Sequence, residues 1–134
     1  MREYYFDSRK EGRQRTDEEH YTELEKLADG LHISAVIVDP SAASFIEVIR
    51  RHGRFRVEKA SNAVIDGIRN VATRLQCGDI FICDCCTDCI REFGMYRWDE
   101  KALMDKPIKE NDHSMDDVRY FVHKVFAPEL FSFK

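Results

Sequence analysis

The sequence predicts an α/β fold in which helices flank a layered sheet of mostly parallel strands. Two observations carry this prediction. Strand-like and helix-like segments alternate along the chain, which is typical of parallel sheets with helical crossovers. Two short runs, 33–38 and 80–82, are largely apolar on both faces, as strands buried inside a sheet are.

The first half of the chain is expected to contain two helices between strands. The first helix has the clearest start, because Thr16 and Glu19 form a capping box, and Gly30 provides its end. The expected elements are, in order, a strand end at 3–6, a helix from 16, a strand at 33–38, a helix at 44–51 ended by Gly53, and a half-exposed strand at 54–58.

The second half continues the alternation. A helix over 64–75 is the most regular, since apolar residues recur three and four positions apart from Ile68 to Leu75. The remaining expected elements are a buried strand at 80–82, a short helix at 88–93, a polar loop at 99–111 that contains Pro107, and a helix from Asp112 to Phe126 that Pro128 interrupts.

Length and composition indicate one globular domain over residues 1–134. The formal net charge of −4 argues against a protein that coats DNA, which is usually basic. The negative net charge is still compatible with a nuclease, because catalytic carboxylates add negative charge. The first residues lack the apolar run of a signal peptide, and no stretch approaches the ~20 apolar residues of a membrane span. We therefore expect a cytoplasmic protein.

Four of the five cysteines crowd into residues 83–89. Cys86 and Cys89 have the C-x-x-C spacing that zinc sites and redox sites use. A zinc site normally takes its second ligand pair from elsewhere in the chain, and no C-x-x-C or H-x-x-x-H lies at the usual distance. We favour small, partly buried side chains at the end of a strand, with a zinc-stabilised binding module as an alternative.

Asp39 follows the strand 33–38 at the point where the backbone is expected to leave the sheet. Ligands of open α/β sheets collect outside the carboxyl ends of the strands, and Pro40 keeps Asp39 out of helical geometry. Asp39 is therefore a candidate metal ligand. The alternative is that it only caps the following helix, a role that aspartate fills well.

A second acidic cluster lies at the start of the last helix. Asp112 and Asp116 are four residues apart, and His113 and Asp116 are three apart, so these side chains share one side of a helix. Close carboxylates repel each other unless a cation lies between them. The alternative is an acidic N-terminus favoured by the helix dipole, which accounts for Asp112 better than for Asp116. If the fold brings Asp39 to this cluster, the result is an oxygen-rich metal site of the kind that cuts phosphodiester bonds.

Basic residues are candidates for holding DNA phosphates. Lys106 and Lys109 lie in the loop directly before the acidic helix, where they would help to grip a nucleic-acid backbone. Lys59 and Arg69 are further candidates. Each of these residues is more often simply a solvated surface charge.

Taken together, these residues resemble the C-terminal nuclease domain of the large terminase subunits of tailed phages. The resemblance extends over nearly the whole chain, and its separate matches occur in the order of the family. The matching segments are 3–7, 16–19, 38–42, 66–70, 92–99, 111–113, Asp116 and 119–120.

The resemblance implies a ribonuclease-H-like layered sheet with flanking helices. It also implies a DNA endonuclease that cuts concatemeric viral DNA during genome packaging, with two Mg²⁺ or Mn²⁺ ions held by acidic residues. Asp39 and Asp116 match catalytic, metal-holding carboxylates, His113 matches a catalytic histidine, and Asp112 is an additional metal ligand or outer acid. The implied partners are double-stranded DNA, the terminase ATPase domain, the small subunit and the portal or procapsid, in the cytoplasm of a bacterial host.

The chain departs from the family pattern at its start. The first catalytic aspartate of the family lies on the central strand, before the stretch that matches residues 3–6. We therefore expect an N-terminally truncated domain that lacks the first strands and the ATPase domain. The strand at 33–38 would then expose an unpaired edge, which predicts self-association. The alternative is a catalytically inactive prophage remnant or fragment that acts at most as a DNA- or partner-binding module.

Overall fold

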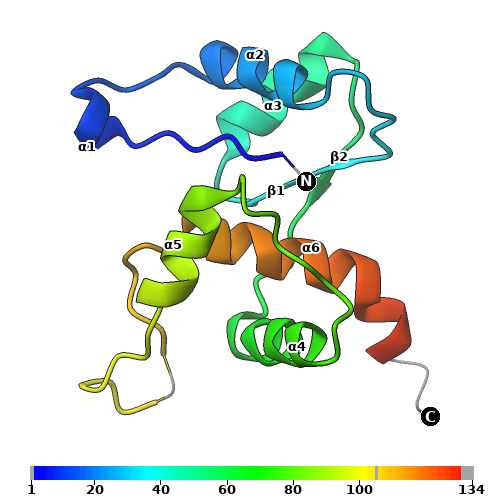
Figure 1. Ribbon diagram of the computed structural model, residues 1–134. Coiled ribbons are helices and arrows are strands. Elements are labelled where there is room, and N and C mark those ends of the chain that lie inside the picture. Colours follow the sequence, from blue (N-terminus) through cyan, green and yellow to red (C-terminus); the bar gives the residue numbers. More distant parts are fainter. Residues whose placement is uncertain (1, 105, 131–134) are drawn as a thin grey trace. The chain divides into compact units, whose positions relative to one another are not determined.

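The computed structural model describes residues 2–104 and 106–130 (Figure 1). The chain divides into two compact units, an N-terminal unit, Arg2–Ala60, and a C-terminal unit that begins at Ser61. Over the described ranges it has six helices and two strands, which is a mixed α/β content. The expectation of one domain over 1–134 stays a prediction.

The N-terminal unit contains both of the strands found in the described chain. They pair in parallel, with Val38 opposite Lys59, so the predicted parallel pairing is confirmed for these two strands. The bounds of the elements are α1 Ser8–Glu11, α2 Asp17–Leu27, β1 Val36–Val38, α3 Ala43–His52 and β2 Val57–Lys59. Gly53 caps α3 in the left-handed conformation, with φ 69°, as expected for the residue that ends a helix.

The core of the N-terminal unit lies where α2 and α3 pack together. Tyr21 of α2 stacks on His52 of α3 with ring centroids 3.8 Å apart, and Nε2 of His52 lies 2.8 Å from a Glu18 carboxylate oxygen. The last residue of β1, Val38, belongs to the same buried cluster. This packing fixes the position of Val38, and Asp39 is the next residue in the chain. The buried residues are Tyr21, Ala28, Val38, Ile46, Val48, Ile49 and Phe55.

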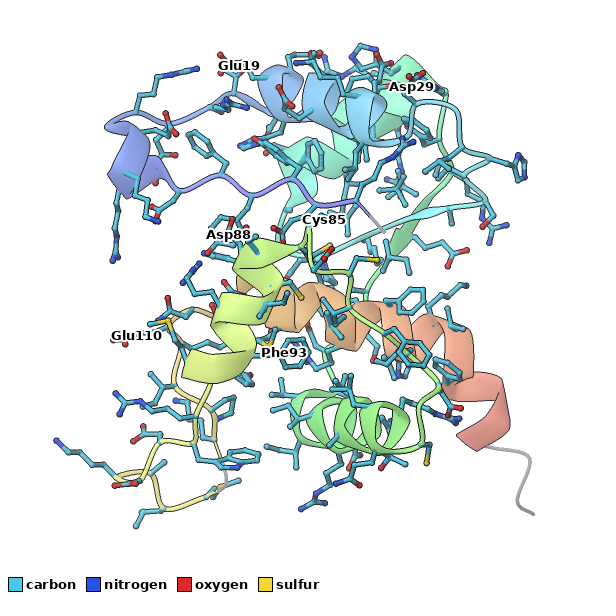
Figure 2. All side chains as sticks on the ribbon, in the orientation of Figure 1. Glu19, Asp29, Cys85, Asp88, Phe93 and Glu110 are labelled. Atoms are coloured by element: carbon cyan, nitrogen blue, oxygen red, sulfur yellow. The ribbon has the colours of Figure 1, made fainter. Side chains whose placement is uncertain are left out.

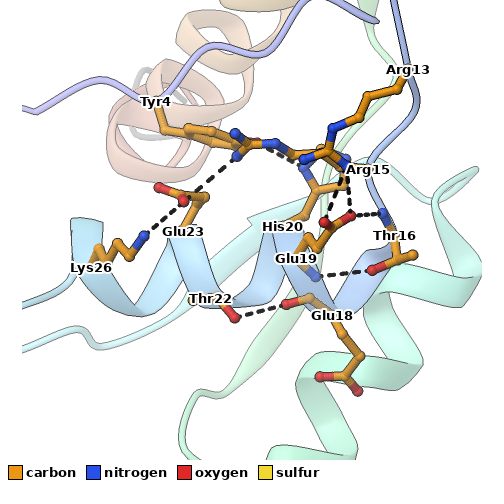
Figure 3. Close-up of polar contacts among 10 residues, drawn as sticks. All are labelled: Tyr4, Arg13, Arg15, Thr16, Glu18, Glu19, His20, Thr22, Glu23 and Lys26. Carbon is orange, nitrogen blue, oxygen red and sulfur yellow. Dashed lines mark hydrogen bonds and ion pairs between the residues drawn. The ribbon is translucent and has the colours of Figure 1, made fainter. Parts of the chain in front are cut away.

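The predicted capping box at the start of α2 is confirmed (Figure 3). The Glu19 amide donates to Oγ1 of Thr16 at 3.2 Å, and the Thr16 amide donates to the Glu19 carboxylate at 2.7 Å. The hydrogen bond from the Thr16 backbone, followed by that from Arg13, lowers the pKa of the Glu19 carboxyl. The helix ends at Leu27, and Gly30 takes φ 71° in the turn that follows.

Residues 3–6 do not form a strand, which corrects that expectation. Side chains attach this segment to α2 instead (Figure 3). The Tyr4 hydroxyl pairs with Nδ1 of His20 at 3.0 Å, and Arg15 donates to the same hydroxyl at 3.1 Å. The aromatic residues that suggested a strand therefore pack against a helix.

The described part of the C-terminal unit consists of three helices joined by loops. The bounds are α4 Val64–Gln76, α5 Thr87–Met95 and α6 His113–Leu130, and α6 packs against both α4 and α5. Between α6 and α5 lies a buried cluster formed by Cys86, Cys89 and Met115. None of the helices in the described residues is both long enough and apolar enough to cross a membrane.

Two expectations for this unit are wrong. Residues 80–82 form no strand, and Phe81 is 79% exposed, because three apolar residues do not define a strand without a partner strand beside them. The last helix continues past Pro128 and is described as far as Leu130, since a single proline removes one backbone donor and can bend a helix without ending it.

The cysteine cluster consequently lies at the start of α5 and not at the end of a strand. Cys86 is the N-cap residue of α5. Cys86 and Cys89 are buried, whereas Cys83 and Cys85 are exposed. The two cysteines of the C-x-x-C pair thus contribute to the packing between α5 and α6.

Candidate functional site

The predicted acidic cluster lies on the first turn of α6. Asp112 directly precedes the helix, and its carbonyl accepts a hydrogen bond from the Asp116 amide at 2.8 Å. His113 is the first residue of the helix. We call Asp112, His113 and Asp116 the acidic turn. The side chains of Asp112 and Asp116 are 14% and 22% exposed, so both carboxylates are partly shielded from water.

A carboxylate from another helix holds the acidic turn in place. Glu92 of α5 is completely buried, and its Oε2 accepts hydrogen bonds from the amides of Ser114, at 2.6 Å, and Met115, at 3.2 Å. Amides in the first turn of a helix have no partner within the helix, and the helix dipole favours a negative charge there. Glu92 thus caps α6 from α5.

Asp116 is oriented by Arg119, which lies one turn further along α6. Nη2 of Arg119 donates to Oδ1 of Asp116 at 2.9 Å, and the arginine is only 4% exposed. Its guanidinium also lies 5.0 Å from the centroid of the Tyr120 ring. Because a buried arginine has lost most of its rotamer freedom, it fixes the Asp116 side chain and leaves Oδ2 outside the ion pair.

Gly67 allows Arg119 to take this position. This glycine is buried in α4, and a Cβ atom on it would lie 2.5 Å from both Cγ and Cδ of Arg119, which is well inside van der Waals contact. The missing side chain lets the stem of Arg119 lie directly on the α4 backbone. The acidic turn therefore depends on residues from all three helices of the C-terminal unit.

Tyr96, the residue after α5, interacts with the same charged pair. Burial raises the pKa of its hydroxyl, and the negative charge of Asp116 raises that pKa further, while Arg119 opposes this effect. Tyr96 therefore stays neutral to a higher pH than an exposed tyrosine does. It presents a hydroxyl, and not a phenolate, to the environment of Asp116.

The basic residues predicted to contact DNA lie in different places. Nζ of Lys109 is 3.7 Å from Oδ2 of Asp112, so Lys109 lies beside the acidic turn. Lys106 is exposed in the loop before α6, where its carbonyl accepts from the Asp99 amide at 2.7 Å. Arg69 is exposed on α4.

Asp39 lies in the N-terminal unit, directly after β1. Its Oδ1 accepts from the amide and the hydroxyl of Ser41 at 2.8 and 2.7 Å. The N-cap residue of α3 is Ala42, so the structure does not support the alternative that Asp39 caps this helix. Lys59 ends β2 opposite Val38, which places Lys59 and Asp39 at the same end of the two strands.

The donor types of these residues suit Mg²⁺ or Mn²⁺, which prefer carboxylate oxygens. Within the part of the chain that the structure describes, no group of three or more His, Cys, Asp or Glu side chains is arranged to hold a metal ion. The acidic turn, with Lys109 beside it, and Asp39, with Lys59 beside it, are two separate groups in two units. Their common role in one metal site stays a prediction.

Sequence reasoning missed the three residues that support the acidic turn, Glu92, Arg119 and Gly67. Glu92 had a readable signal, because it lies three residues after Cys89 and four before Tyr96, on what becomes the packed side of α5. A carboxylate on such a face needs a buried donor. Gly67 also had a signal, because a glycine inside a regular helix lowers the stability of that helix. A glycine at such a position often marks the close approach of another element.

Comparisons with known proteins place this geometry in context. No protein-family model matches the chain. It is 24% identical over 128 residues to the terminase large subunit of Escherichia phage T5, a match that covers 91% of this chain and 29% of that protein.

Solved structures give stronger matches. A crystal structure of the large terminase from a thermophilic bacteriophage is 49% identical, with a TM-score of 0.88 and coverage of 92% of this chain and 32% of that one. The same large terminase in complex with ADP is 48% identical, with a TM-score of 0.88, over 96% of this chain and 32% of that one. The homologues of this chain are thus phage large terminases, and it spans about a third of their length.

Proposed function

We propose that this chain is part of the nuclease domain of a phage terminase large subunit, with a ribonuclease-H-like sheet and metal-dependent endonuclease activity on viral DNA. One observation carries the proposal. The chain is 49% identical to part of the large terminase of a thermophilic bacteriophage. In it a carboxylate follows a parallel strand, and an acidic turn begins a helix that is buried on one side. In this role the chain cuts concatemeric DNA as the genome is packaged.

The proposed metal ligands are Asp39, Asp116 and Asp112, and His113 is proposed as a proton-transfer group. Such ions, when bound, supply a deprotonated water and stabilise the leaving oxygen. The task of Arg119 is to hold Oδ1 of Asp116, which leaves Oδ2 for a metal ion. The task of Glu92 is to hold the first turn of α6 rigid.

Double-stranded DNA is the proposed substrate, and Lys59, Arg69, Lys106 and Lys109 are the proposed phosphate contacts. Lys109 is the best supported of these, because it already lies beside Asp112. The further proposed partners are those of a packaging motor, namely the terminase ATPase domain, the small subunit and the portal or procapsid.

The activity is tested by nicking of a supercoiled plasmid in Mn²⁺. The wild-type chain should convert the plasmid to open circles, and EDTA should stop the reaction. We expect Asp116→Asn and Asp39→Asn each to lower the rate about 100-fold or more, because each removes a proposed metal ligand. Asp117→Asn is the matched control, since it removes the same charge from the neighbouring, exposed position of α6 and should leave the rate unchanged.

Three outcomes contradict this proposal in different ways. Cleavage that survives both substitutions would exclude these carboxylates as ligands. Equal loss in the Asp117→Asn control would point to a general charge effect. Absence of cleavage by the wild-type chain would favour the alternative of an inactive fragment, and retained DNA binding in a gel-shift assay would then identify a binding module.

Self-association is the second proposal for the partners of this chain. The Val36 amide donates to the Arg56 carbonyl, and the Val38 carbonyl accepts from the Ala60 amide. Both residues of β1 thus bond towards β2. The amide of Ile37, which lies between them, therefore points away from β2. No second partner strand for β1 occurs in the described ranges. We expect the molar mass from light scattering to rise with concentration, and Ile37→Pro to reduce the rise by removing an outward donor. A constant monomer mass in the wild-type chain would refute this expectation.

A further inference from the structure

Cysteine thiols gather at the turn that enters α5, among residues that the proposed metal site does not use. Four of the five cysteines lie at 83–89, and Figure 2 shows Cys85 at this end of α5. Cys83 and Cys85 are exposed, whereas Cys86 and Cys89 are buried. Exposed and buried thiols therefore occur together in one short segment.

A tight turn brings two of these cysteines close together. The Cys86 amide donates to the Cys83 carbonyl at 3.0 Å, which is the hydrogen bond of a β-turn over residues 83–86. In such a turn the Cα atoms of the first and fourth residues are less than about 7 Å apart. Disulfides join residues whose Cα atoms are about 4.4–6.8 Å apart. Cys83 and Cys86 thus have the C-x-x-C spacing and a backbone separation that a disulfide can span.

The other pairings fit less well. Cys85 and Cys86 are neighbours, and consecutive Cα atoms, about 3.8 Å apart, are closer than disulfide geometry prefers. Cys86 and Cys89 also have the C-x-x-C spacing, but both are buried in the cluster with Met115, where a dissolved oxidant does not reach them. Cys83 is exposed, so an oxidant can react there first and Cys86 can complete the disulfide.

We propose that Cys83 and Cys86 are a redox-active dithiol that reacts with low-molecular-weight disulfides such as glutathione disulfide. The Cys83 thiolate attacks one sulfur of glutathione disulfide, which forms a mixed disulfide and releases one glutathione thiolate. The Cys86 thiolate then attacks the Cys83 sulfur, which forms the protein disulfide and releases the second glutathione thiolate. The protein loses two electrons and two protons, and one glutathione disulfide becomes two glutathione molecules.

This dithiol requires neither metal nor DNA, so it is independent of the proposed nuclease activity. It does lie beside the packing that supports the acidic turn. Cys86 is the N-cap residue of α5 and packs against Met115 of α6. We expect the amide NMR signal of Met115 to shift on oxidation and to return on reduction with dithiothreitol. An unchanged signal would overturn the link between the disulfide and the packing of α5 on α6.

Oxidation of the whole reduced chain with glutathione disulfide tests the pairing. The remaining thiols are blocked with N-ethylmaleimide in denaturant, the disulfide is reduced, and the released thiols are labelled with iodoacetamide. Fragment mass spectra then assign each label to one cysteine. We expect the second label on Cys83 and Cys86 and the first label on the other three cysteines. A second label on Cys86 and Cys89, or on no cysteine pair, would overturn the proposal.

Variants test the order of the two steps. Cys83→Ser changes an exposed residue and should slow formation of the protein disulfide at least tenfold. Cys86→Ser should leave Cys83 as a lasting mixed disulfide with glutathione, since the second attack is removed. Cys77→Ser is the matched control, because Cys77 is an exposed thiol at the end of α4, and it should react as the wild-type chain does. Unchanged disulfide formation in Cys83→Ser would contradict the proposal, and so would an equal loss in Cys77→Ser.

Discussion

Replacing Gly67 with alanine is expected to lower the free energy of unfolding by about 1–3 kcal/mol. The sign is informative, because alanine inside a helix is normally more favourable than glycine by about 1 kcal/mol. Here the added Cβ would lie 2.5 Å from two carbons of Arg119. The stem of a buried side chain cannot move aside easily, so α4 and α6 must separate or Arg119 must leave Asp116.

A double-mutant cycle checks this explanation. In an Arg119→Ala background the obstacle is gone, and Gly67→Ala should then raise the free energy of unfolding by about 1 kcal/mol. Urea unfolding followed by the fluorescence of Trp98, the only tryptophan, measures both values. Gly94→Ala is the matched control, since a Cβ at that helical position would meet no described atom within 4 Å apart from its chain neighbours and the backbone of its own helix. Stabilisation by Gly67→Ala in both backgrounds would show that Arg119 does not lie on the α4 backbone.

Replacing Glu92 with alanine is expected to cost about 2–4 kcal/mol of unfolding free energy. The substitution removes the acceptor of two buried amide hydrogen bonds, at 2.6 and 3.2 Å. It also removes a negative charge from the N-terminus of α6. Hydrogen exchange should locate the damage, with faster exchange at the amides of Ser114 and Met115.

Two further variants separate the causes. Glu92→Gln keeps a carbonyl acceptor and loses only the charge, so its cost should be smaller than that of Glu92→Ala. Glu100→Ala removes an exposed glutamate from the preceding loop and should change the stability by no more than about 0.5 kcal/mol. If Glu92→Ala left the exchange of Ser114 and Met115 unchanged, these amides would not depend on Glu92.

Features set by neighbouring residues were predictable from the sequence. The capping box needs only the interval between Thr16 and Glu19, and the acidic turn needs only the spacing of Asp112 and Asp116. The strand at 80–82 was predicted wrongly because a strand also needs a partner, which local composition does not report. Residues 3–6 were predicted as a strand because they are aromatic. Aromatic side chains pack equally well against a helix, as Tyr4 and Phe6 do against His20 of α2.

The support of the acidic turn was not predictable for a different physical reason. Glu92 and Gly67 matter through contacts with another helix, and such contacts depend on how helices cross. The spacing pattern of one helix shows which face is buried but not which residue it meets. Asp39 was placed correctly after a strand, because a β-branched run followed by Pro40 is a local signal. Whether Asp39 and Asp116 share one metal site depends on the tertiary arrangement, which local sequence signals do not report.

The capping of α6 by Glu92 has a consequence for the variability of this part of the chain. The start of α6 is tied to α5 by a contact that spans 22 residues of sequence, in addition to the ion pair between Asp112 and Lys109 of the connection that leads into it. We therefore expect insertions at the exposed tip of this connection, at 100–104, to leave the hydrogen bonds of Ser114 and Met115 with Glu92 intact, since lengthening a surface loop costs little free energy. In this arrangement the length and sequence of the connection can vary independently of the position of the acidic turn.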